Sequence, residues 1–310
     1  MLKIGTTFSG IGAPEQALKN LKIPHIVKWA CDNDKYCKQT YFANHSCEKW
    51  YDDITTINID ELEYVDLYVF GFPCQDCSIN GKKDLNSGRT ILVEYSLRII
   101  EKIKPKYFIF ENVKGLLSKK FSLFFNSIIE NLSQNYNLQY KILNSKNFEV
   151  PQSRERVFCI GIRKDIEQNF NFPVGKETCL RLQDIIEHQD SNLPENHKFY
   201  TYPFRKTKNY RQYDRSGKGY SGQPDRVYYP YSFSPTLPAF GNGIPLILLP
   251  NDKIRYLTTL ERKRLQSFPD DFIFPVKDGL AWKQLGNTIT VNVLEAIFKQ
   301  LFKEEHLEIL

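Results

Sequence analysis

Residues 71–78 read Gly-Phe-Pro-Cys-Gln-Asp-Cys-Ser, and they follow an apolar run, Val-Asp-Leu-Tyr-Val-Phe, at residues 65–70. The length of that run and its β-branched and aromatic side chains are typical of a buried parallel strand that ends in a loop. In open α/β sheets, ligands bind beyond the carboxyl ends of the strands, where loops vary on a rigid support. The sequence therefore places Cys74 where the nucleophile of an α/β protein would lie.

Two interpretations of Cys74 are open from the residue alone. A cysteine becomes a strong nucleophile when nearby donors or positive charge favour its thiolate. Pro73 fixes one backbone dihedral before it, and Gln75 offers an amide after it. Most free cysteines, however, are simply small buried hydrophobic residues. The choice between the two depends on the rest of the chain.

The composition favours a folded protein of one large or two modest domains. The chain has 310 residues, of which 41% are hydrophobic and 14% aromatic, and no run approaches the roughly 18 apolar residues of a membrane helix. It starts directly in a strand-like segment without a signal peptide, so we expect a cytoplasmic location. Seven cysteines, an odd number, argue for reduced thiols. Cys74 and Cys77 form one Cys-x-x-Cys pair, but no second pair completes a zinc site, so no metal is expected.

A glycine turn near the start of the chain predicts a cofactor site. An alternating strand at residues 2–8 is followed by Ser-Gly-Ile-Gly at residues 9–12, and Pro14 suits the first turn of a helix. A second strand at residues 25–31 ends in Asp32, 22 positions beyond Gly10. A carboxylate about 20 residues after such a turn binds ribose hydroxyls. An adenosine-containing cofactor is therefore predicted, although glycines for a tight turn and a solvated aspartate remain the simpler alternatives.

A second reactive group follows another predicted strand. The short apolar strand at residues 106–110 ends in Glu-Asn-Val at residues 111–113. A glutamate beside an apolar strand is costly to bury as an anion, so Glu111 needs partners or a raised pKa, and either suits a proton donor. Strands are predicted at residues 138–143 and 157–162 as a pair at the sheet edge. Between them, alternation puts Gln152, Arg154 and Arg156 on one face, where the arginines bind phosphate, hold Glu111, or are only solvated.

Positive charge is concentrated in one stretch. The formal net charge is +6, and residues 200–226 carry seven cations against two carboxylates, a net charge of +5. Six aromatic residues are interleaved with these cations, which suits contact with the phosphates and bases of a nucleic acid. An exposed coil is the alternative. The residues predicted to bind the substrate here are Arg205, Lys206, Lys208, Arg211, Arg215 and Lys218.

Together these segments resemble the cytosine carbon-5 DNA methyltransferases over nearly the whole chain. The resemblance rests on Phe-Ser-Gly-Ile-Gly at 8–12, Pro-Cys-Gln at 73–75, Glu-Asn-Val at 111–113, Gln-x-Arg-x-Arg at 152–156, the block at 255–270 and Gly-Asn at 286–287. It implies an α/β fold: a Rossmann-like S-adenosylmethionine-dependent methyltransferase sheet with a smaller, irregular, β-rich target-recognition domain. Thr6, Asn33 and Cys77 depart from the residues that the family often has at these positions.

The resemblance also implies roles for individual residues. Cys74 would attack carbon-6 of cytosine, Glu111 would bind nitrogen-3, and Arg154 and Arg156 would orient Glu111 and meet the oxygen of the base. Gln75 and Gln152 are expected to contact the substrate. The expected S-adenosylmethionine contacts are Phe8, Gly10, Ile11, Asp32, Asp53, Ile54, Pro73, Leu92, Asn287 and Thr288.

The expected domains are a catalytic and cofactor-binding domain at 1–172, a target-recognition domain at 173–257, a hinge and helix at 258–283, and a return to the catalytic domain at 284–310. The substrate implied is double-stranded DNA whose target cytosine is flipped out of the helix. A modification enzyme of the bacterial type II kind is expected, with a possible restriction endonuclease that acts on the same site without a stable complex. A monomer is the simplest state for an enzyme that acts on one base per visit.

Three other functions are kept as alternatives. A relative of this family methylates tRNA, but its Cys-Phe-Thr tripeptide is absent here. A catalytically inactive DNA-binding regulator on the same fold would not need Cys74, Glu111 and the two arginines. A dinucleotide oxidoreductase would need a third glycine after Gly12 and has no use for Pro-Cys-Gln. The recognised DNA sequence does not follow from these residues, because base contacts depend on loop geometry.

Overall fold

The computed structural model describes residues 1–73, 92–187, 204–213, 226–239, 245–249 and 254–303. Its contacts divide the chain into two compact units. Unit 1 comprises residues 1–143, 155–174 and 293–310, and unit 2 comprises residues 144–154 and 175–292. The chain thus crosses between the units more than once, and each unit is described by itself.

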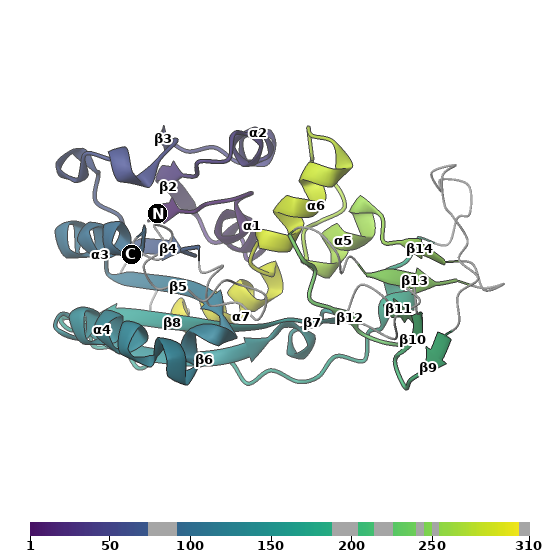
Figure 1. Ribbon diagram of the computed structural model, residues 1–310. Helices are drawn as coiled ribbons and strands as arrows, with labels where there is room; N and C mark the ends of the chain where they lie inside the picture. The colour runs from purple at the N-terminus through teal and green to yellow at the C-terminus, as the bar shows by residue number, and fades with distance from the viewer. Residues whose placement is uncertain (74–91, 188–203, 214–225, 240–244, 250–253, 304–310) are drawn as a thin grey trace. The chain divides into compact units, whose positions relative to one another are not determined.

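Unit 1 is built on a seven-stranded sheet in the order β3-β2-β1-β4-β5-β8-β6 (Figure 1). The strands β1, β2, β3, β4 and β5 pair in parallel, and β8 joins β5 in antiparallel fashion. The strand bounds are β1 Leu2–Thr7, β2 His25–Cys31, β3 Lys49–Tyr51, β4 Leu67–Phe70, β5 Tyr107–Val113, β6 Tyr136–Asn144 and β8 Glu155–Arg163. Strand β4, at the centre of the sheet, is apolar and buried throughout, as expected of a strand covered on both faces.

Helices α3 (Leu92–Ile103) and α4 (Ser122–Ser133) cover one face of this sheet. Their apolar positions, among them Ile99 and Ile128, join one buried cluster with alternate strand residues such as Tyr68, Phe70 and Phe110. The apolar residues recur every three to four positions along the helices and every second position along the strands. They therefore face one another and form a single core. The periodicity of residues 92–103 thus specifies the packing of α3.

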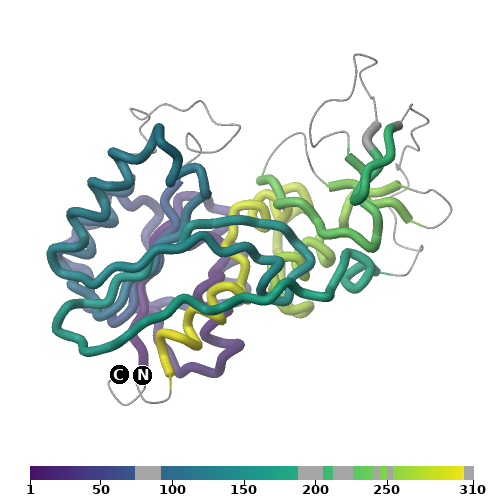
Figure 2. The backbone as a smooth tube through the Cα atoms, turned by 90° about the horizontal axis from the view of Figure 1, so that it is seen from below, coloured from purple at the N-terminus to yellow at the C-terminus, as the bar shows by residue number. Residues whose placement is uncertain are grey.

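Helices α1 (Ala13–Asn20) and α7 (Val291–Leu301) lie on the opposite face, as Figure 2 shows from below. The ring of Tyr107 points away from the α3 side and meets Phe302 edge-on, with 5.5 Å between centroids. The Asn20 amide donates to Glu295 at 2.7 Å and ties the two helices together. Helix α2 (Lys35–Asn44) follows β2, and Asp34 caps its start. The sheet is therefore sandwiched between helices, as in doubly wound folds.

Unit 2 contains a five-stranded sheet in the order β14-β13-β11-β10-β9 and a two-stranded pair, β12 with β7. The bounds are β7 Gln152–Ser153, β9 Phe204–Lys206, β10 Tyr210–Tyr213, β11 Arg226–Tyr228, β12 Ser234–Pro235, β13 Leu246–Leu248 and β14 Ile254–Tyr256. The unit also has α5 (Thr259–Leu265) and α6 (Asp278–Asn287). Short 3-10 helices complete the two units: η1 Ile54–Thr56, η2 Ile59–Glu61, η4 Lys114–Leu117, η5 Lys119–Phe121, η6 Ser145–Asn147 and η7 Leu182–Asp184.

A capping box starts α5. The Thr258 hydroxyl accepts from the backbone N–H of Glu261, and the Glu261 carboxylate accepts from the N–H of Thr258. Glu261 is fully buried and also receives a two-pronged ion pair from Arg255 of β14, at 2.6 and 2.7 Å. A buried carboxylate with this many donors is satisfied as an anion, and it joins the five-stranded sheet to the helix that follows it.

The fold class expected from the sequence is confirmed, and so are its principal strands. Strand β2 has the expected bounds, and the predicted edge pair corresponds to β8 and β6. Strand β5 was predicted too short: it continues to Val113 because β8 pairs with it along that whole length. Helix α5 lies in the expected hinge and helix at 258–283; it ends at Leu265, and Ser267 has a left-handed φ of 61°. Among the described residues, no helix has the length and apolarity that crossing a membrane requires.

Candidate active site

The carboxyl ends of β1, β2, β4 and β5 meet at one edge of the unit 1 sheet because these strands are parallel. The glycine turn follows β1 there. Gly10 and Gly12 have left-handed φ values of 56° and 83°, and Phe8 has a φ of 53°, which is uncommon for a residue with a side chain. Glycine at residues 10 and 12 therefore permits a turn that other residues adopt only with strain.

Asp32, at the end of β2, holds this turn. One carboxylate oxygen accepts from the backbone N–H of Gly10 at 2.8 Å, and the other accepts from the N–H of Asp34 at 2.9 Å. The nearest atom to a Cβ placed on Gly10 would be the carbonyl oxygen of Phe8, at 4.0 Å. The backbone is thus open to a ligand beside a carboxylate. The sequence predicted both residues, and the structure places them in direct contact.

The side chain of Ser9 links the glycine turn to the ends of β1 and β2. Its hydroxyl accepts from the Cys31 N–H at 3.0 Å and contacts the Cys31 carbonyl at 3.1 Å, and it lies 2.7 Å from the hydroxyl of Thr6. These bonds join the last residues of β1 and β2. Ser9 is a turn residue that sequence reasoning passed over, although a hydroxyl beside a glycine turn is a signal for such a role.

The other predicted cofactor residues divide between the units. In unit 1, Ile11 and Ile54 are buried, and Asp53 caps η1 by accepting from the backbone and hydroxyl of Thr55, both at 2.9 Å. Pro73 and Leu92 are half-buried, and they are the last and first described residues on either side of residues 74–91. Asn287 and Thr288 belong to unit 2. Eight of the ten predicted contacts are therefore in the unit that carries the glycine turn, namely Phe8, Gly10, Ile11, Asp32, Asp53, Ile54, Pro73 and Leu92.

Glu111 points from β5 toward Arg156 of β8. The Arg156 Nε lies 3.1 Å from Glu111 Oε1, and both side chains are mostly buried. Burial lowers the pKa of Arg156, and the carboxylate of Glu111 raises it again. The guanidinium remains charged because arginine is not deprotonated in folded proteins. Glu111 thus has the partner that a buried carboxylate needs.

The same part of β5 anchors the segment that leads toward Cys74. The side-chain amide of Asn112 is buried and donates to the Phe72 carbonyl at 3.0 Å. A Cβ placed on Gly71 would lie 3.6 Å from Glu111 Oε2. Asn112 is part of the Glu-Asn-Val motif, and its contact with Phe72 gives it a positioning role that the motif alone does not indicate.

Arg154 and Gln152 lie in unit 2, whereas Arg156 lies in unit 1. The guanidinium of Arg154 donates to the carbonyls of Gly286 and Thr288, at 3.1 and 2.9 Å. The fully buried Gln152 amide donates to the Leu265 carbonyl at 2.8 Å and accepts from the Leu237 N–H at 3.0 Å. These bonds organise unit 2. Contact of either residue with a base stays a prediction.

Part of the basic segment forms the antiparallel pair β9 and β10. Lys206 and Arg211 are directly opposite each other in the register, and Arg205, Lys206 and Lys208 are exposed. Like charges directly opposite on a strand pair destabilise it, and an anion such as a phosphate relieves that cost. On β11, Arg226 stacks over the Tyr210 ring at 4.8 Å. Arg215 and Lys218 lie outside the described residues, as do Cys74, Gln75 and Cys77.

The glycine turn suits S-adenosylmethionine as a cofactor. A carboxylate has about four acceptor positions, so Asp32 can receive ribose hydroxyls in addition to backbone N–H groups. The open face of Gly10 admits close approach of a ligand. Within the part of the chain that the structure describes, no cluster of His, Cys, Asp or Glu residues is arranged to hold a metal ion.

Three kinds of similarity to known proteins agree with this geometry. Residues 2–303 match the family model for C-5 cytosine-specific DNA methylase. The type II methyltransferase M.SsoII of Shigella sonnei is 33% identical over 302 residues, which cover 95% of this chain and 78% of that protein. The type II methyltransferase M.Bsp6I of Bacillus sp. (strain RFL6) is 32% identical over 319 residues, which cover 98% of this chain and 99% of that protein.

The crystal structure of the S. pombe Dnmt2 methyltransferase superimposes with a TM-score of 0.76. It is 21% identical in sequence, and the match covers 98% of this chain and 99% of that one. At this identity the similarity establishes the shared fold.

Proposed function

Because this chain belongs to the C-5 cytosine-specific DNA methylase family, and so is an S-adenosylmethionine-dependent DNA cytosine-5 methyltransferase, we propose that it methylates one cytosine in a short, specific duplex sequence through a covalent adduct with Cys74. The observation that carries this proposal is the arrangement at the end of β5. There Arg156 holds Glu111, and Asn112 holds the carbonyl of Phe72, two residues before Cys74.

The chemistry requires a nucleophile because carbon-5 of cytosine reacts poorly by itself. The Cys74 thiolate adds to carbon-6, and the electron pair moves toward nitrogen-3, where Glu111 donates a hydrogen bond or proton. Carbon-5 is then nucleophilic. When bound, S-adenosylmethionine supplies the methyl group that carbon-5 takes. Water takes the carbon-5 proton, the Cys74 thiolate leaves from carbon-6, and nitrogen-3 returns its proton to Glu111, which restores the aromatic ring.

Arg156 is proposed to fix the orientation of Glu111. It contacts Oε1, while Oε2 is the oxygen that faces Gly71 at the start of the segment leading to Cys74. The ion pair with Arg156 thus restrains the orientation of the Glu111 carboxylate. Arg154, which the resemblance pairs with Glu111, is proposed to act within unit 2 by holding the 286–288 backbone.

A base inside a duplex cannot reach such a pocket, so the target cytosine is proposed to flip out of the helix. Unit 2 is proposed to be the target-recognition part, and the exposed cations of β9 and its loop to bind the DNA backbone. The relatives M.SsoII and M.Bsp6I are named as type II methyltransferases, which supports a role in modification. We expect a monomer in the cytoplasm, and a cognate endonuclease that acts on the same site separately.

The direct test is transfer of labelled methyl groups from S-adenosylmethionine to duplex DNA, followed by sequencing for 5-methylcytosine. Wild type should label a cytosine in one short sequence, and Cys74→Ser should not. The control is Cys179→Ser, since Cys179 is an exposed free cysteine in unit 2, and this variant should retain full activity. DNA with 5-fluorocytosine at the target should form an adduct that survives denaturation, because fluorine cannot leave as a proton does.

Other outcomes would replace the proposal. Label in tRNA and not in DNA would make the substrate an RNA. Label in neither polymer, with DNA binding intact, would make the protein a DNA-binding regulator. Binding of a nicotinamide cofactor in place of S-adenosylmethionine would indicate an oxidoreductase. Transfer by Cys74→Ser at the wild-type rate would exclude the covalent route.

A further inference from the structure

Glu15, in the first turn of α1, is a buried carboxyl group outside the residues assigned above. Its exposed fraction is 1%. Oε1 accepts from the hydroxyl of Tyr41 at 3.0 Å and from the hydroxyl of Thr6 at 3.3 Å. Oε2 is also buried, and it has no hydrogen-bond partner among the described residues. Oε1 is therefore held by hydroxyls from β1 and α2, whereas no described residue holds Oε2.

Hydrogen bonds connect Glu15 to the glycine turn. The Thr6 hydroxyl that contacts Glu15 is also 2.7 Å from the hydroxyl of Ser9, which receives the N–H of Cys31 at 3.0 Å. When Thr6 donates to Glu15, its oxygen can accept from Ser9, whose hydroxyl also lies 3.1 Å from the alternative acceptor, the Cys31 carbonyl. Glu15 is the acceptor at which this chain of donors ends, and Gly10 directly follows Ser9 in the turn.

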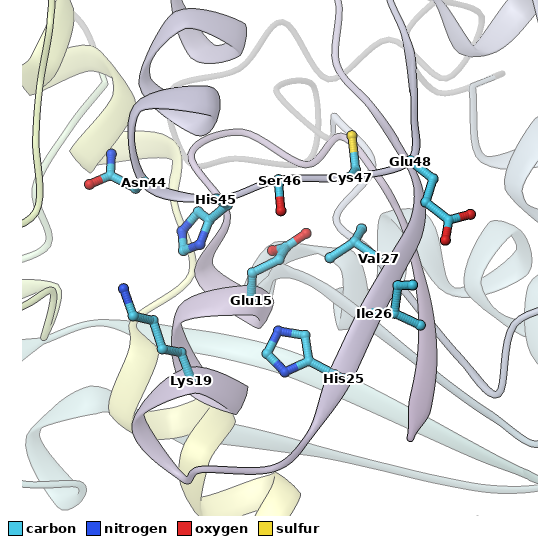
Figure 3. Close-up of a pocket in the computed structure, with 10 residues that line it drawn as sticks. All are labelled: Glu15, Lys19, His25, Ile26, Val27, Asn44, His45, Ser46, Cys47 and Glu48. Atoms are coloured by element: carbon cyan, nitrogen blue, oxygen red, sulfur yellow. The ribbon is translucent and has the colours of Figure 1, made fainter.

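A cavity of about 420 Å³ in unit 1 lies beside Glu15 (Figure 3). Its titratable and charged lining residues are Glu15 and Lys19 of α1, His25 of β2, and His45, Cys47 and Glu48 after α2. In the view of Figure 3 the Glu15 carboxylate points up between His45 and Val27, while the Cys47 sulfur and the Glu48 carboxylate point away from it. The His45 ring also abuts the turn, since a Cβ on Gly12 would lie 2.4 Å from it.

The surroundings of Glu15 offer little positive charge. Burial lowers the pKa of His45 to about 4 and raises the pKa of the Cys47 thiol to about 11, so both are neutral at pH 7. Burial also raises the pKa of Glu15 to about 7, against the weaker lowering by its hydrogen bonds, including those from Tyr41 and Thr6. Lys19 is the one lysine or arginine among the residues that line the cavity. The protonated form of Glu15, with its proton on Oε2, suits this environment.

We propose that Glu15 is a positioning residue for the cofactor loop: as a neutral acid it holds Thr6 and, through Ser9, the turn that carries Gly10. The hydrogen bonds from Thr6 and Tyr41 favour ionised Glu15, but the larger cost of burying the anion favours a turn of the carboxylate toward water in the cavity. That movement gives up Thr6 and loosens the turn. The cofactor binds only protein whose turn is ordered. The apparent affinity of the protein for the cofactor is therefore proportional to the fraction of molecules with an ordered turn, and it falls as Glu15 ionises. The cofactor part of this inference rests on the proposed function.

The first test needs no cofactor. Protection of the Gly10 amide from hydrogen exchange reports how often its bond to Asp32 opens. In wild-type protein the protection factor should fall about tenfold between pH 6.0 and pH 8.5. In Glu15→Gln, which keeps Oε1 as an acceptor and cannot ionise, it should stay within twofold over that range. Glu48→Gln alters another carboxylate of the same cavity and should behave like wild type.

The second test measures the affinity for S-adenosylhomocysteine by calorimetry at the same two pH values. This product carries no sulfonium charge, so a change in affinity does not arise from attraction to an anion. Wild type should lose about tenfold in affinity, and Glu15→Gln less than twofold. Thr6→Val, which removes the intervening hydroxyl with little change in shape, should bind weakly at pH 6.0 and lose the pH dependence.

Wild-type pH dependence that persists in Glu15→Gln or in Thr6→Val would overturn the inference, as would affinity that rises with pH. If S-adenosylhomocysteine does not bind wild type at all, the proposed function fails, while the hydrogen-exchange arm still decides the role of Glu15 in the turn.

Discussion

At the scale of single residues, the pair of Glu111 and Arg156 carries the strongest prediction. Glu111→Gln keeps the shape of the side chain, but it can neither ionise nor transfer an acidic proton. We expect the single-turnover rate of methyl transfer to fall roughly 100-fold, because proton transfer by a positioned acid contributes about 10²–10⁴. The affinity for S-adenosylmethionine should stay within twofold.

The control for this variant is Glu155→Gln. Glu155 is adjacent to the same arginine in sequence but is exposed and pairs with Lys114 at 3.0 Å. This variant should transfer methyl groups like wild type. Equal losses in the two variants would show that the effect comes from general disturbance of β8 and not from the acid.

Glu15 gives a second prediction at this scale, for stability against pH. Its pKa is about 7 in the folded protein and near 4.5 when exposed, so the folded state binds the proton more tightly. The free energy of unfolding therefore decreases as pH rises from about 4.5 to about 7, and it stays lower above that. Glu15→Gln should equal wild type at pH 4.5 and exceed it at pH 8 by about 1–3 kcal/mol, measured by urea denaturation.

A glutamate on the surface provides the comparison. Glu94 is exposed on α3, and Glu94→Gln should not change the difference in stability between pH 4.5 and pH 8. If Glu15→Gln has no effect on that difference either, Glu15 does not carry the proton assigned to it.

At the scale of elements, the stability of helix α5 depends on the capping residues at its N-terminus. It has only seven residues, and a helix this short is marginal without help from its ends. Thr258→Ala removes the hydroxyl that receives the Glu261 N–H and also donates to Glu187 at 2.8 Å. We expect it to lower the free energy of unfolding of unit 2 by about 1 kcal/mol, measured by chemical denaturation.

The matched control removes a hydroxyl inside a helix. The Ser127 hydroxyl contacts the Phe124 carbonyl within α4 and is solvent-exposed. Ser127→Ala should be neutral or slightly stabilising because alanine has the higher helix propensity. A loss in Ser127→Ala as large as that in Thr258→Ala would contradict the assignment of the cap.

At the scale of the whole molecule, the location of positive charge matters more than its total. Lys206 is exposed on β9 and directly opposite Arg211, and we propose that both face phosphates. Lys206→Gln should weaken binding to specific and non-specific DNA alike. Titrations at several salt concentrations should show a slope of log affinity against log salt that is smaller by about 0.9.

Lys164 is the control for this charge. It lies in unit 1 and is exposed, so Lys164→Gln changes the net charge equally without touching the basic strand pair. An equal change of slope in both variants would mean that the affinity for DNA depends only on the total charge of the protein. The assignment of β9 to the DNA interface would then be wrong.

The sequence by itself determined the alternating strands and helices of unit 1, because apolar periodicity and glycine turns are local signals. It also predicted that Asp32 and the turn at Gly10 form one cofactor site, and the structure adds the hydrogen bond between them. Tertiary structure decided what the local pattern could not. Alternation put Arg154 and Arg156 on one face, but the chain passes between units at that point, so Arg156 reaches Glu111 while Arg154 binds the backbone of residues 286–288. The role of Glu15 depends on Thr6 and Tyr41, which reach it from β1 and α2, and burial among elements distant in sequence is what sets the pKa of a carboxyl group.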